Sequence, residues 1–202
     1  GMRRNRVRVA LSLLCITFAF ALFGVLAGVD QSFDEAMAGL DGDSRRLFVT
    51  SRVSQLDQLP LAYLVKIRQI EGVLTVFPSP RLYGYYQSPD NWVGGFAVDA
   101  IAEFSVYSEF RVPAEQVRAM NELRTGAIAG RNLAQQYGWK IGDRITLLSD
   151  GWQRSGGDNS WVFDIVGIYD APDPSLGRSF FLNYEYLNEA RDVGKDSVGN
   201  FI

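Results

Sequence analysis

Two stretches decide the fold of this chain: TGAIAGRNLA at residues 125–134 and YGWKIGDRITL at residues 137–147. The first predicts a short strand followed by a short helix, which ends at Gly138. The second predicts a turn at Gly142-Asp143 and then another strand. A third stretch, WVFDIVGIY at residues 161–169, is the longest predicted strand.

The same unit continues on both sides of these stretches. Strands are predicted over residues 92–99, 104–110, 125–129, 144–148, 161–169 and 179–182. Helices are predicted over residues 113–124, 132–137 and 184–191. Residues 150–160 are rich in Gly, Asp, Asn and Ser and predict a hairpin loop. Many short strands with few helices predict a compact, β-rich barrel or sandwich. The turn cluster at residues 88–91 marks its beginning.

A smaller α+β unit precedes the turn cluster. Strands are predicted over residues 47–53, 73–77 and 82–87. Pro60 begins a helix that carries an apolar face and ends at Gly72; the face is formed by Leu61, Leu64, Ile67 and Ile70. These elements hold too little apolar surface to close a core alone. We therefore expect strands from later in the chain to pair with them.

The N-terminal region predicts a membrane helix. Residues 9–29 contain no charged side chain, and such a helix is about 31 Å long at its usual rise, close to the roughly 30 Å of a bilayer core. Four arginines precede it, namely Arg3, Arg4, Arg6 and Arg8. Five acids follow it before the next cation, Arg45. This asymmetry predicts a cytoplasmic N-terminus and an extracytoplasmic chain after about residue 30.

The alternative is a cleaved signal peptide, because Ala36-Met37-Ala38 fits a small-x-small cleavage site. Signal peptides usually have shorter apolar runs, and this site lies beyond three acids. Both observations favour a retained anchor. Gly1 before Met2 resembles the remnant of an expression tag.

One face of the predicted membrane helix consists of small residues. Their spacing places them on a single stripe, formed by Thr17, Ala21, Gly24 and Gly28. Gly24 and Gly28 form a G-x-x-x-G motif, and such motifs let a second helix approach closely in lipid. We expect a packing face here, although Gly and Ala are also common in membrane helices without partners.

The composition excludes much catalytic chemistry. Among 202 residues there is no histidine and one cysteine, Cys15, so His-ligated zinc, Ser-His-Asp catalysis and an internal disulfide are excluded. After the four N-terminal arginines, 16 Lys and Arg remain of 20, against 23 Asp and Glu, a net charge of −7. Such an acidic chain is not expected to bind nucleic acid.

No motif predicts a catalytic, cofactor or metal site. Asp170 and Asp173 are the nearest pair of carboxylates, but they lie in a Pro-Asp turn after a strand. Asp41-Gly42-Asp43 lacks the remaining ligands of a calcium loop. A set of aromatic residues is weaker evidence for a groove that binds a partner or an apolar ligand: Tyr83, Tyr85, Tyr86, Trp92, Trp152 and Trp161. Packing within the core is the interpretation that we favour for them.

The two opening stretches, together with FDIVGIY at residues 163–169, resemble the periplasmic core domain of MacB/FtsX-type ABC transporter permeases. In that family a strand, a short helix, a Gly-Asp turn and another strand occur in this order. The arginine-rich residues 3–8 before the first span are also similar. The resemblance covers most of the chain, and its residues are structural rather than reactive.

The resemblance implies an α+β protein in which an N-terminal transmembrane helix precedes an α/β porter-like unit with an inserted β-rich, sabre-like unit. Residues 1–43 would be the basic end, the transmembrane helix and its extension. Residues 44–88 would be the first half of the porter-like part, and residues 89–195 the sabre-like domain. Residues 196–202 would begin the strand that returns to the porter-like part.

The resemblance also implies partners and a location. Members of the family reside in the bacterial inner (cell) membrane, dimerise with a second permease and bind a cytoplasmic ATP-binding subunit. ATP-driven movement is relayed to the outer domain, which moves lipoproteins, peptides, toxins or drugs. The implied protein is therefore not an enzyme and holds no cofactor, and its partners are the ATPase, a homo- or heterodimeric permease and the lipid bilayer.

The sequence departs from the family in one respect. It lacks the second porter half, three further membrane helices and any ATPase motif, so we expect a truncated permease or a natural short relative. A single-pass, membrane-anchored periplasmic binding or interaction module remains the alternative. An anchored hydrolase is disfavoured by the missing histidine.

Overall fold

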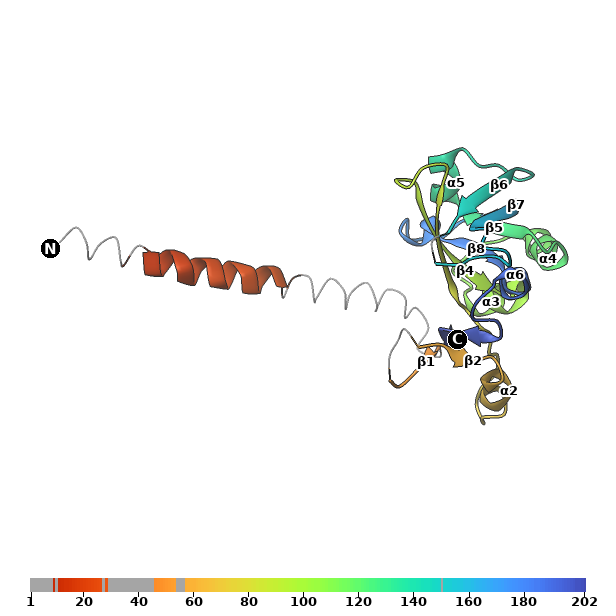
Figure 1. Ribbon diagram of the computed structural model, residues 1–202, viewed down its shortest axis with the longest axis horizontal. Helices are drawn as coiled ribbons and strands as arrows, with labels where there is room; N and C mark the ends of the chain where they lie inside the picture. The colour runs from red at the N-terminus through yellow and green to blue at the C-terminus, as the bar shows by residue number, and fades with distance from the viewer. Residues whose placement is uncertain (1–8, 10, 27, 29–45, 54–56, 150) are drawn as a thin grey trace. The chain divides into compact units, whose positions relative to one another are not determined.

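The structure is a computed structural model that describes residues 9, 11–26, 28, 46–53, 57–149 and 151–202. The chain forms two compact units, Gly1–Arg46 and Leu47–Ile202. In the first, residues 11–26 are helical (Figure 1). Among the described residues, no helix is both long and apolar enough to cross a membrane, so the transmembrane helix is not confirmed. Arg3, Arg4, Arg6 and Arg8 lie outside the described residues, as do Ala36-Met37-Ala38 and Asp41-Gly42-Asp43.

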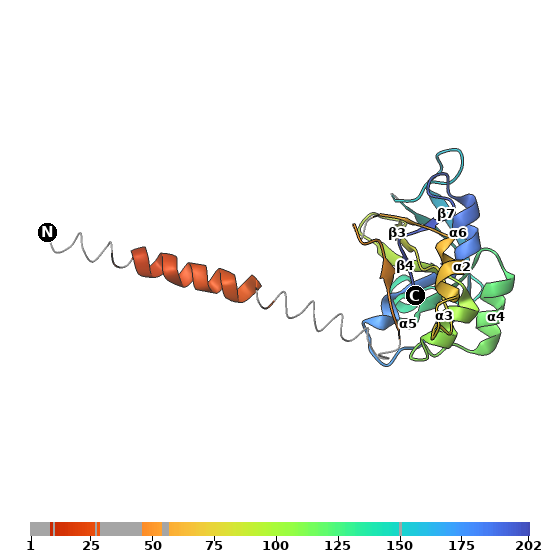
Figure 2. The same ribbon diagram turned by 90° about the horizontal axis from the view of Figure 1, so that it is seen from below.

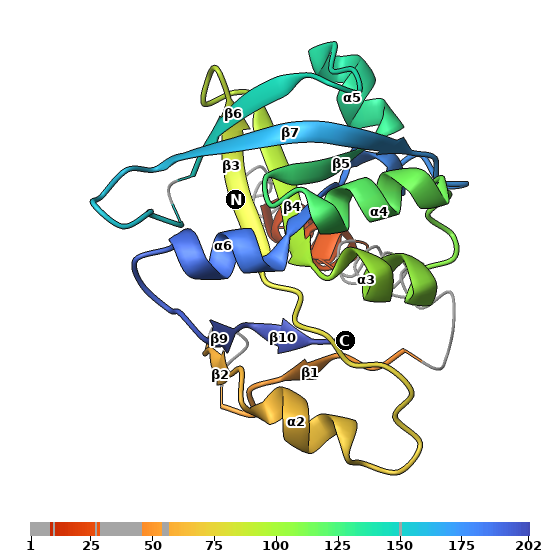
Figure 3. The same cartoon turned by 90° about the vertical axis from the view of Figure 1, so that its right-hand side faces the viewer.

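The second unit is built around a closed β-barrel. Its strands are β3 (Arg81–Tyr86), β4 (Trp92–Val98), β5 (Gly126–Gly130), β6 (Arg144–Leu148), β7 (Ser160–Tyr169) and β8 (Phe180–Asn183). They close in the order β3-β4-β8-β5-β7-β6 (Figure 3). The pairs β4–β8 and β5–β7 are parallel, and the remaining pairs are antiparallel. The predicted β-rich unit is thus a barrel rather than a sandwich.

Alternating burial fills the barrel interior. Along β7, every second residue is buried, beginning with Trp161, Phe163 and Ile165. The interior rings meet edge to edge, with Phe163 contacting Phe180 at 5.2 Å between ring centroids. At the end of β5, Gly130 lies against the Gly177 carbonyl group so closely that a Cβ would collide with it. The stretch at residues 125–134 therefore has a glycine, Gly130, at a position where a neighbouring carbonyl group leaves no room for a side chain.

Helices cover the outside of the barrel. They are α3 (Ala100–Val106), α4 (Ala114–Glu122), α5 (Arg131–Tyr137) and α6 (Tyr184–Ala190), with a short 3-10 turn, η1 (Leu176–Arg178). α3 and α4 pack side by side (Figure 2). Beneath them lies a second apolar cluster that includes Met120, Ile128 and Phe181.

The strand predicted over residues 104–110 is wrong. Residues 104–110 were expected to be extended, yet Phe104 lies in the helix α3. The Asp99 carboxylate caps this helix by accepting a hydrogen bond from the backbone N–H of Ala102 at 2.9 Å. The aromatic residues of this stretch recur every third position, and Phe104 and Phe110 both contact the Phe181 ring. A spacing of three is not the period of two that a half-buried strand requires, so the pattern did not support the strand.

Short strands and one helix form a separate layer beneath the barrel (Figure 3), which we call the strand layer. It consists of β1 (Val49–Thr50), β2 (Leu59–Pro60), α2 (Tyr63–Arg68), β9 (Ser197–Val198) and β10 (Asn200–Phe201). β1 pairs with β10, and β2 pairs with β9. The expectation that strands from later in the chain pair with the early α+β segment is therefore confirmed. A small core of Val76, Val198 and Phe201 lies behind these strands.

Element boundaries in the strand layer differ from the prediction. Pro60 lies in β2 rather than at a helix start, and α2 begins at Tyr63. Residues 73–77 form no strand. Their apolar side chains lie in different environments: Val76 and Phe77 are buried, whereas Leu74 is 95% exposed. The strand predicted over residues 47–53 is shortened to β1, and α2 ends at Arg68, before Gly72. Apart from residues 104–110, the predicted strands and helices of the barrel unit match the structure within one or two residues.

Candidate functional site

The carboxylates singled out in the sequence have structural partners. Asp170 is paired with the Arg131 guanidinium, and the second hydrogen bond, from Nη2, measures 2.8 Å. This pairing holds the pKa of Asp170 below its usual value. Asp173 accepts a hydrogen bond from the backbone N–H of Ser175 at 2.7 Å, which lowers its pKa as well. Neither carboxylate is arranged to exchange a proton with the other. Among the described residues, no group of His, Cys, Asp or Glu is placed to hold a metal ion.

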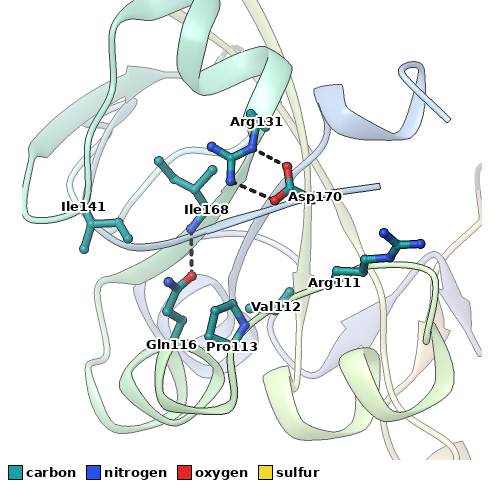
Figure 4. Close-up of a pocket in the computed structure, with 8 residues that line it drawn as sticks. All are labelled: Arg111, Val112, Pro113, Gln116, Arg131, Ile141, Ile168 and Asp170. Atoms are coloured by element: carbon teal, nitrogen blue, oxygen red, sulfur yellow. Dashed lines mark hydrogen bonds and ion pairs between the residues drawn. The ribbon is translucent and has the colours of Figure 1, made fainter. Parts of the chain in front are cut away.

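A shallow cavity of about 540 Å³ lies beside this ion pair, at the ends of β5 and β7 (Figure 4). It is lined by Arg111, Val112, Pro113, Gln116, Arg131, Ile141, Ile168 and Asp170. The Gln116 side-chain oxygen accepts a hydrogen bond from the backbone N–H of Ile168 at 3.0 Å. Because Asp170 is paired with Arg131, and Gln116 with the Ile168 backbone, this cavity offers shape and an ion pair rather than a reactive group.

The aromatic residues do not line one groove. Trp161 is fully buried, and Tyr86 packs against Trp139 with 5.2 Å between ring centroids. The packing interpretation is confirmed for these two. Tyr83 and Trp92 differ, because they stack on the surface at 5.9 Å and are 46% and 60% exposed.

A buried arginine connects the barrel to the strand layer. Arg191, at the end of α6, is fully buried. Its Nη2 donates hydrogen bonds to the side-chain oxygen of Asn188 at 2.5 Å and to the carbonyl oxygen of Ser197, in β9, at 2.7 Å. Its guanidinium carbon lies 5.0 Å from the centroid of the Trp152 ring. Burial lowers the pKa of Arg191, because the charged form has lost water.

The barrel side of this junction is a hydrogen-bonded loop. The Trp152 indole N–H donates to the carbonyl oxygen of Arg81, at the start of β3, at 2.8 Å. The backbone N–H of Ser155 donates to Ala190 at 3.0 Å, and that of Asp192 donates to Gln153 at 2.8 Å. The loop between β6 and β7 is therefore fastened to the end of α6.

The opposite side of the junction belongs to the strand layer. The Ser197 hydroxyl donates to the side-chain oxygen of Gln58, immediately before β2. The backbone N–H of Leu61 donates to the carbonyl oxygen of Asp196 at 2.7 Å. Asn188 and Asp196 exchange hydrogen bonds between α6 and the turn before β9. Arg191 thus stands where three segments of the chain meet.

Sequence reasoning missed this junction. Arg191 was assigned to the end of a predicted helix, where a cation usually interacts with the helix dipole and with water. Its partners lie on the β6–β7 loop and on β9, and local sequence patterns do not report such contacts. The predicted packing residues Thr17, Ala21 and Gly24 lie in the helix of residues 11–26, and Gly28 is also helical.

The family follows from a comparison with known protein families. The model of the MacB-like periplasmic core domain matches residues 10–201. This chain belongs to that family. No match was found among curated proteins.

Two solved structures share this fold. The extracellular domain of the noncanonic ABC-type transporter YknZ from Gram-positive bacteria aligns with a TM-score of 0.51 at 10% identity, over 77% of this chain and 79% of that one. The periplasmic region of MacB from Actinobacillus actinomycetemcomitans gives a TM-score of 0.51 at 10% identity, over 74% and 66% of the two chains. The family resemblance drawn from residues 125–147 and 163–169 is therefore confirmed.

Proposed function

We propose that this chain is part of the permease subunit of an ABC transporter. Its extracytoplasmic domain couples ATP hydrolysis by a separate cytoplasmic ATPase to the movement of an extracytoplasmic cargo. The single observation that carries this proposal is membership of the MacB-like periplasmic core domain family over residues 10–201. One similar structure is the extracellular domain of the ABC-type transporter YknZ, and the other is the periplasmic region of MacB.

The N-terminal charge pattern supports the orientation that this function requires. Arginines at residues 3, 4, 6 and 8 remain in the cytoplasm, residues 9–29 cross the inner membrane, and the later chain is periplasmic. The small-residue face of Thr17, Ala21, Gly24 and Gly28 packs against another membrane helix. That helix belongs to this permease or to a second permease in a homo- or heterodimer.

The topology of the second unit supports mechanical coupling. β1 and β2 lie early in the chain and pair with β10 and β9, which follow the barrel. Residues 69–80 and 184–196 connect the strand layer to the barrel. A displacement of β1 or β2 therefore reaches the barrel through ladder hydrogen bonds as well as through the covalent chain.

Affinity purification tests the proposal. The natural protein, tagged at its N-terminus, is extracted from membranes in mild detergent, and co-purifying proteins are identified by mass spectrometry. We expect an ABC ATPase subunit, and ATP hydrolysis by the complex. The absence of an ATPase under conditions that preserve a known permease complex, used as the control, would argue against transport.

One observation favours a second candidate, a membrane-anchored binding or interaction module. Tyr83 and Trp92 expose stacked rings, and aromatic side chains are enriched where proteins bind partners. Two results together would favour this candidate: no associated ATPase, and a periplasmic ligand that raises the melting temperature of the protein. Replacing Trp92 by Ala would then abolish the shift in melting temperature.

A further inference from the structure

We propose that Arg191 is the residue that fastens the strand layer to the barrel, so that the two parts of the outer domain move as one body. The inference deepens the proposed function, because coupling requires that movement of the strand layer reaches the barrel. The claim that Arg191 fastens the two layers together does not depend on the proposed function, because it rests on the contacts of this residue.

The contacts of Arg191 span both parts. One nitrogen, Nη2, joins the Asn188 side chain of α6 to the Ser197 carbonyl oxygen of β9. The same guanidinium lies on the Trp152 ring, and the Trp152 indole is hydrogen-bonded to the start of β3. Movement of β9 away from the barrel therefore breaks a charge-assisted hydrogen bond and exposes a stacked arginine.

The alternative connections nearby are weaker. A cavity of about 580 Å³ separates much of the strand layer from α3 and α6. Its lining includes Leu61 and Leu64 on one side, and Val98 and Ala100 on the other. Apolar packing between the layers is interrupted there. The contacts that remain are those of Tyr184, which packs against both cores, and those on the Arg191 side of the interface.

The chemistry of Arg191 fixes the position of β9. Its Nε and Nη1 groups have no hydrogen-bond partner among the described residues, and its two acceptors are neutral. Breaking these contacts is costly, because the hydrogen bonds of a buried charged group replace the water that it has lost.

Hydrogen exchange followed by mass spectrometry tests this inference on the full chain. The strand layer is reported by the amides of Leu61, Phe77 and Ile202, which donate to Asp196, Ile202 and Phe77. The barrel is reported by the amides of Asp164 and Ile165, which donate to Thr125 and Asp143. Both parts are measured in one sample, so folding is checked in the same experiment.

The substitution Arg191→Met keeps a flexible, unbranched stem and removes the guanidinium group with all of its donors. We expect exchange at the strand-layer amides to accelerate by about tenfold or more, while the barrel amides stay within about twofold of the natural chain. Arg191→Lys retains the charge but not the planar fork, and should give an intermediate acceleration. The matched control is Arg118→Met, which removes an exposed arginine of α4 and should leave both sets of amides unchanged.

Equal exchange at the strand-layer amides in Arg191→Met, Arg191→Lys and the natural chain would overturn the inference. So would parallel acceleration in the strand layer and the barrel, or failure of both variants to fold, because Arg191 would then hold the barrel itself. In the complete complex, Arg191→Met should retain ATP hydrolysis and lose its coupling to cargo movement. The absence of an ATPase would refute the proposed function and leave the exchange result standing.

Discussion

Arg144 on β6 donates hydrogen bonds to both carboxylate oxygens of Asp164 on β7, at 2.8 Å from Nε and 3.1 Å from Nη2. The Thr125 hydroxyl, immediately before β5, donates to the same carboxylate at 2.5 Å. Asp164 therefore joins three strands of the barrel. The Arg144 guanidinium and then the Thr125 hydroxyl hold the pKa of Asp164 below its ordinary value.

We predict that Asp164→Asn lowers the free energy of unfolding by about 1 kcal/mol at neutral pH, because the carboxylate charge that accepts these hydrogen bonds is lost. The loss is small because solvent screens the exposed Arg144. A lowered pKa contributes stability above the ordinary value of about 4, and this contribution is lost as pH falls through the folded-state value. The difference between the variant and the natural chain should therefore shrink toward about pH 3. Urea denaturation at both pH values measures it.

Asp90→Asn, at an exposed residue of the turn before β4, is the control for this experiment. It should not alter stability at either pH. A stability difference for Asp164→Asn that stays constant down to about pH 3 would show that the charge of Asp164 is not the cause.

A second prediction concerns the barrel interior. Phe163 is fully buried and contacts the rings of Phe180 and Tyr186. Phe163→Ala should lower the free energy of unfolding by about 3–5 kcal/mol, because it removes buried apolar surface and leaves a cavity. Ile141→Ala, at a side chain that is 54% exposed, should change it by less than about 1 kcal/mol. Equal effects of the two substitutions in urea denaturation would contradict the barrel core described above.

A third prediction uses a pair of glycines. Gly130→Ala should destabilise the protein by about 1–3 kcal/mol, because the new Cβ meets the carbonyl group of Gly177. Gly151→Ala meets no atom within 4 Å and should be nearly neutral. Thermal denaturation of the two variants measures the difference. A neutral Gly130→Ala would mean that the turn at Gly177 moves away without cost.

The prediction for the membrane helix concerns the small-residue face. Gly24→Leu should weaken association of the natural permease in detergent or in a membrane, because a bulky side chain keeps the partner helix at a distance. Ala19→Leu makes a comparable increase in size on the opposite face of the helix and is the matched control. Cross-linking or analytical ultracentrifugation compares the two variants. Equal association would place the contact elsewhere.

The barrel strands were predictable because their patterns are local. The alternation along β7 and the glycine that follows α5 fall within single elements, so residues 160–169 and Gly138 could be read directly. α3 was not predictable in the same way, because residues 104–110 carry no clear strand period and the Phe104 and Phe110 rings pack in a tertiary cluster. Arg191 was missed because Ser197 and Trp152 reach it from separate segments. Family membership was predictable because it rests on local patterns. The junction at Arg191 was not, because it is formed by contacts between separate segments.

The last prediction concerns alkaline pH. Tyr169 is fully buried, and its hydroxyl donates to the Leu176 carbonyl oxygen and accepts from the backbone N–H of Ser179 at 3.2 Å. Burial raises the pKa of Tyr169 above its ordinary value. A raised pKa contributes stability that is present below the ordinary value of about 10, and this contribution declines as pH rises above it.

We therefore expect the free energy of unfolding to fall between about pH 10 and pH 11, and Tyr169→Phe to reduce this fall. At neutral pH the same variant should lose about 1–2 kcal/mol, because the Leu176 carbonyl group loses its donor. Urea denaturation at pH values of about 7, 10 and 11 measures both effects, and Tyr83→Phe, at an exposed ring, serves as the control. An unchanged alkaline slope in Tyr169→Phe would mean that another group limits stability there.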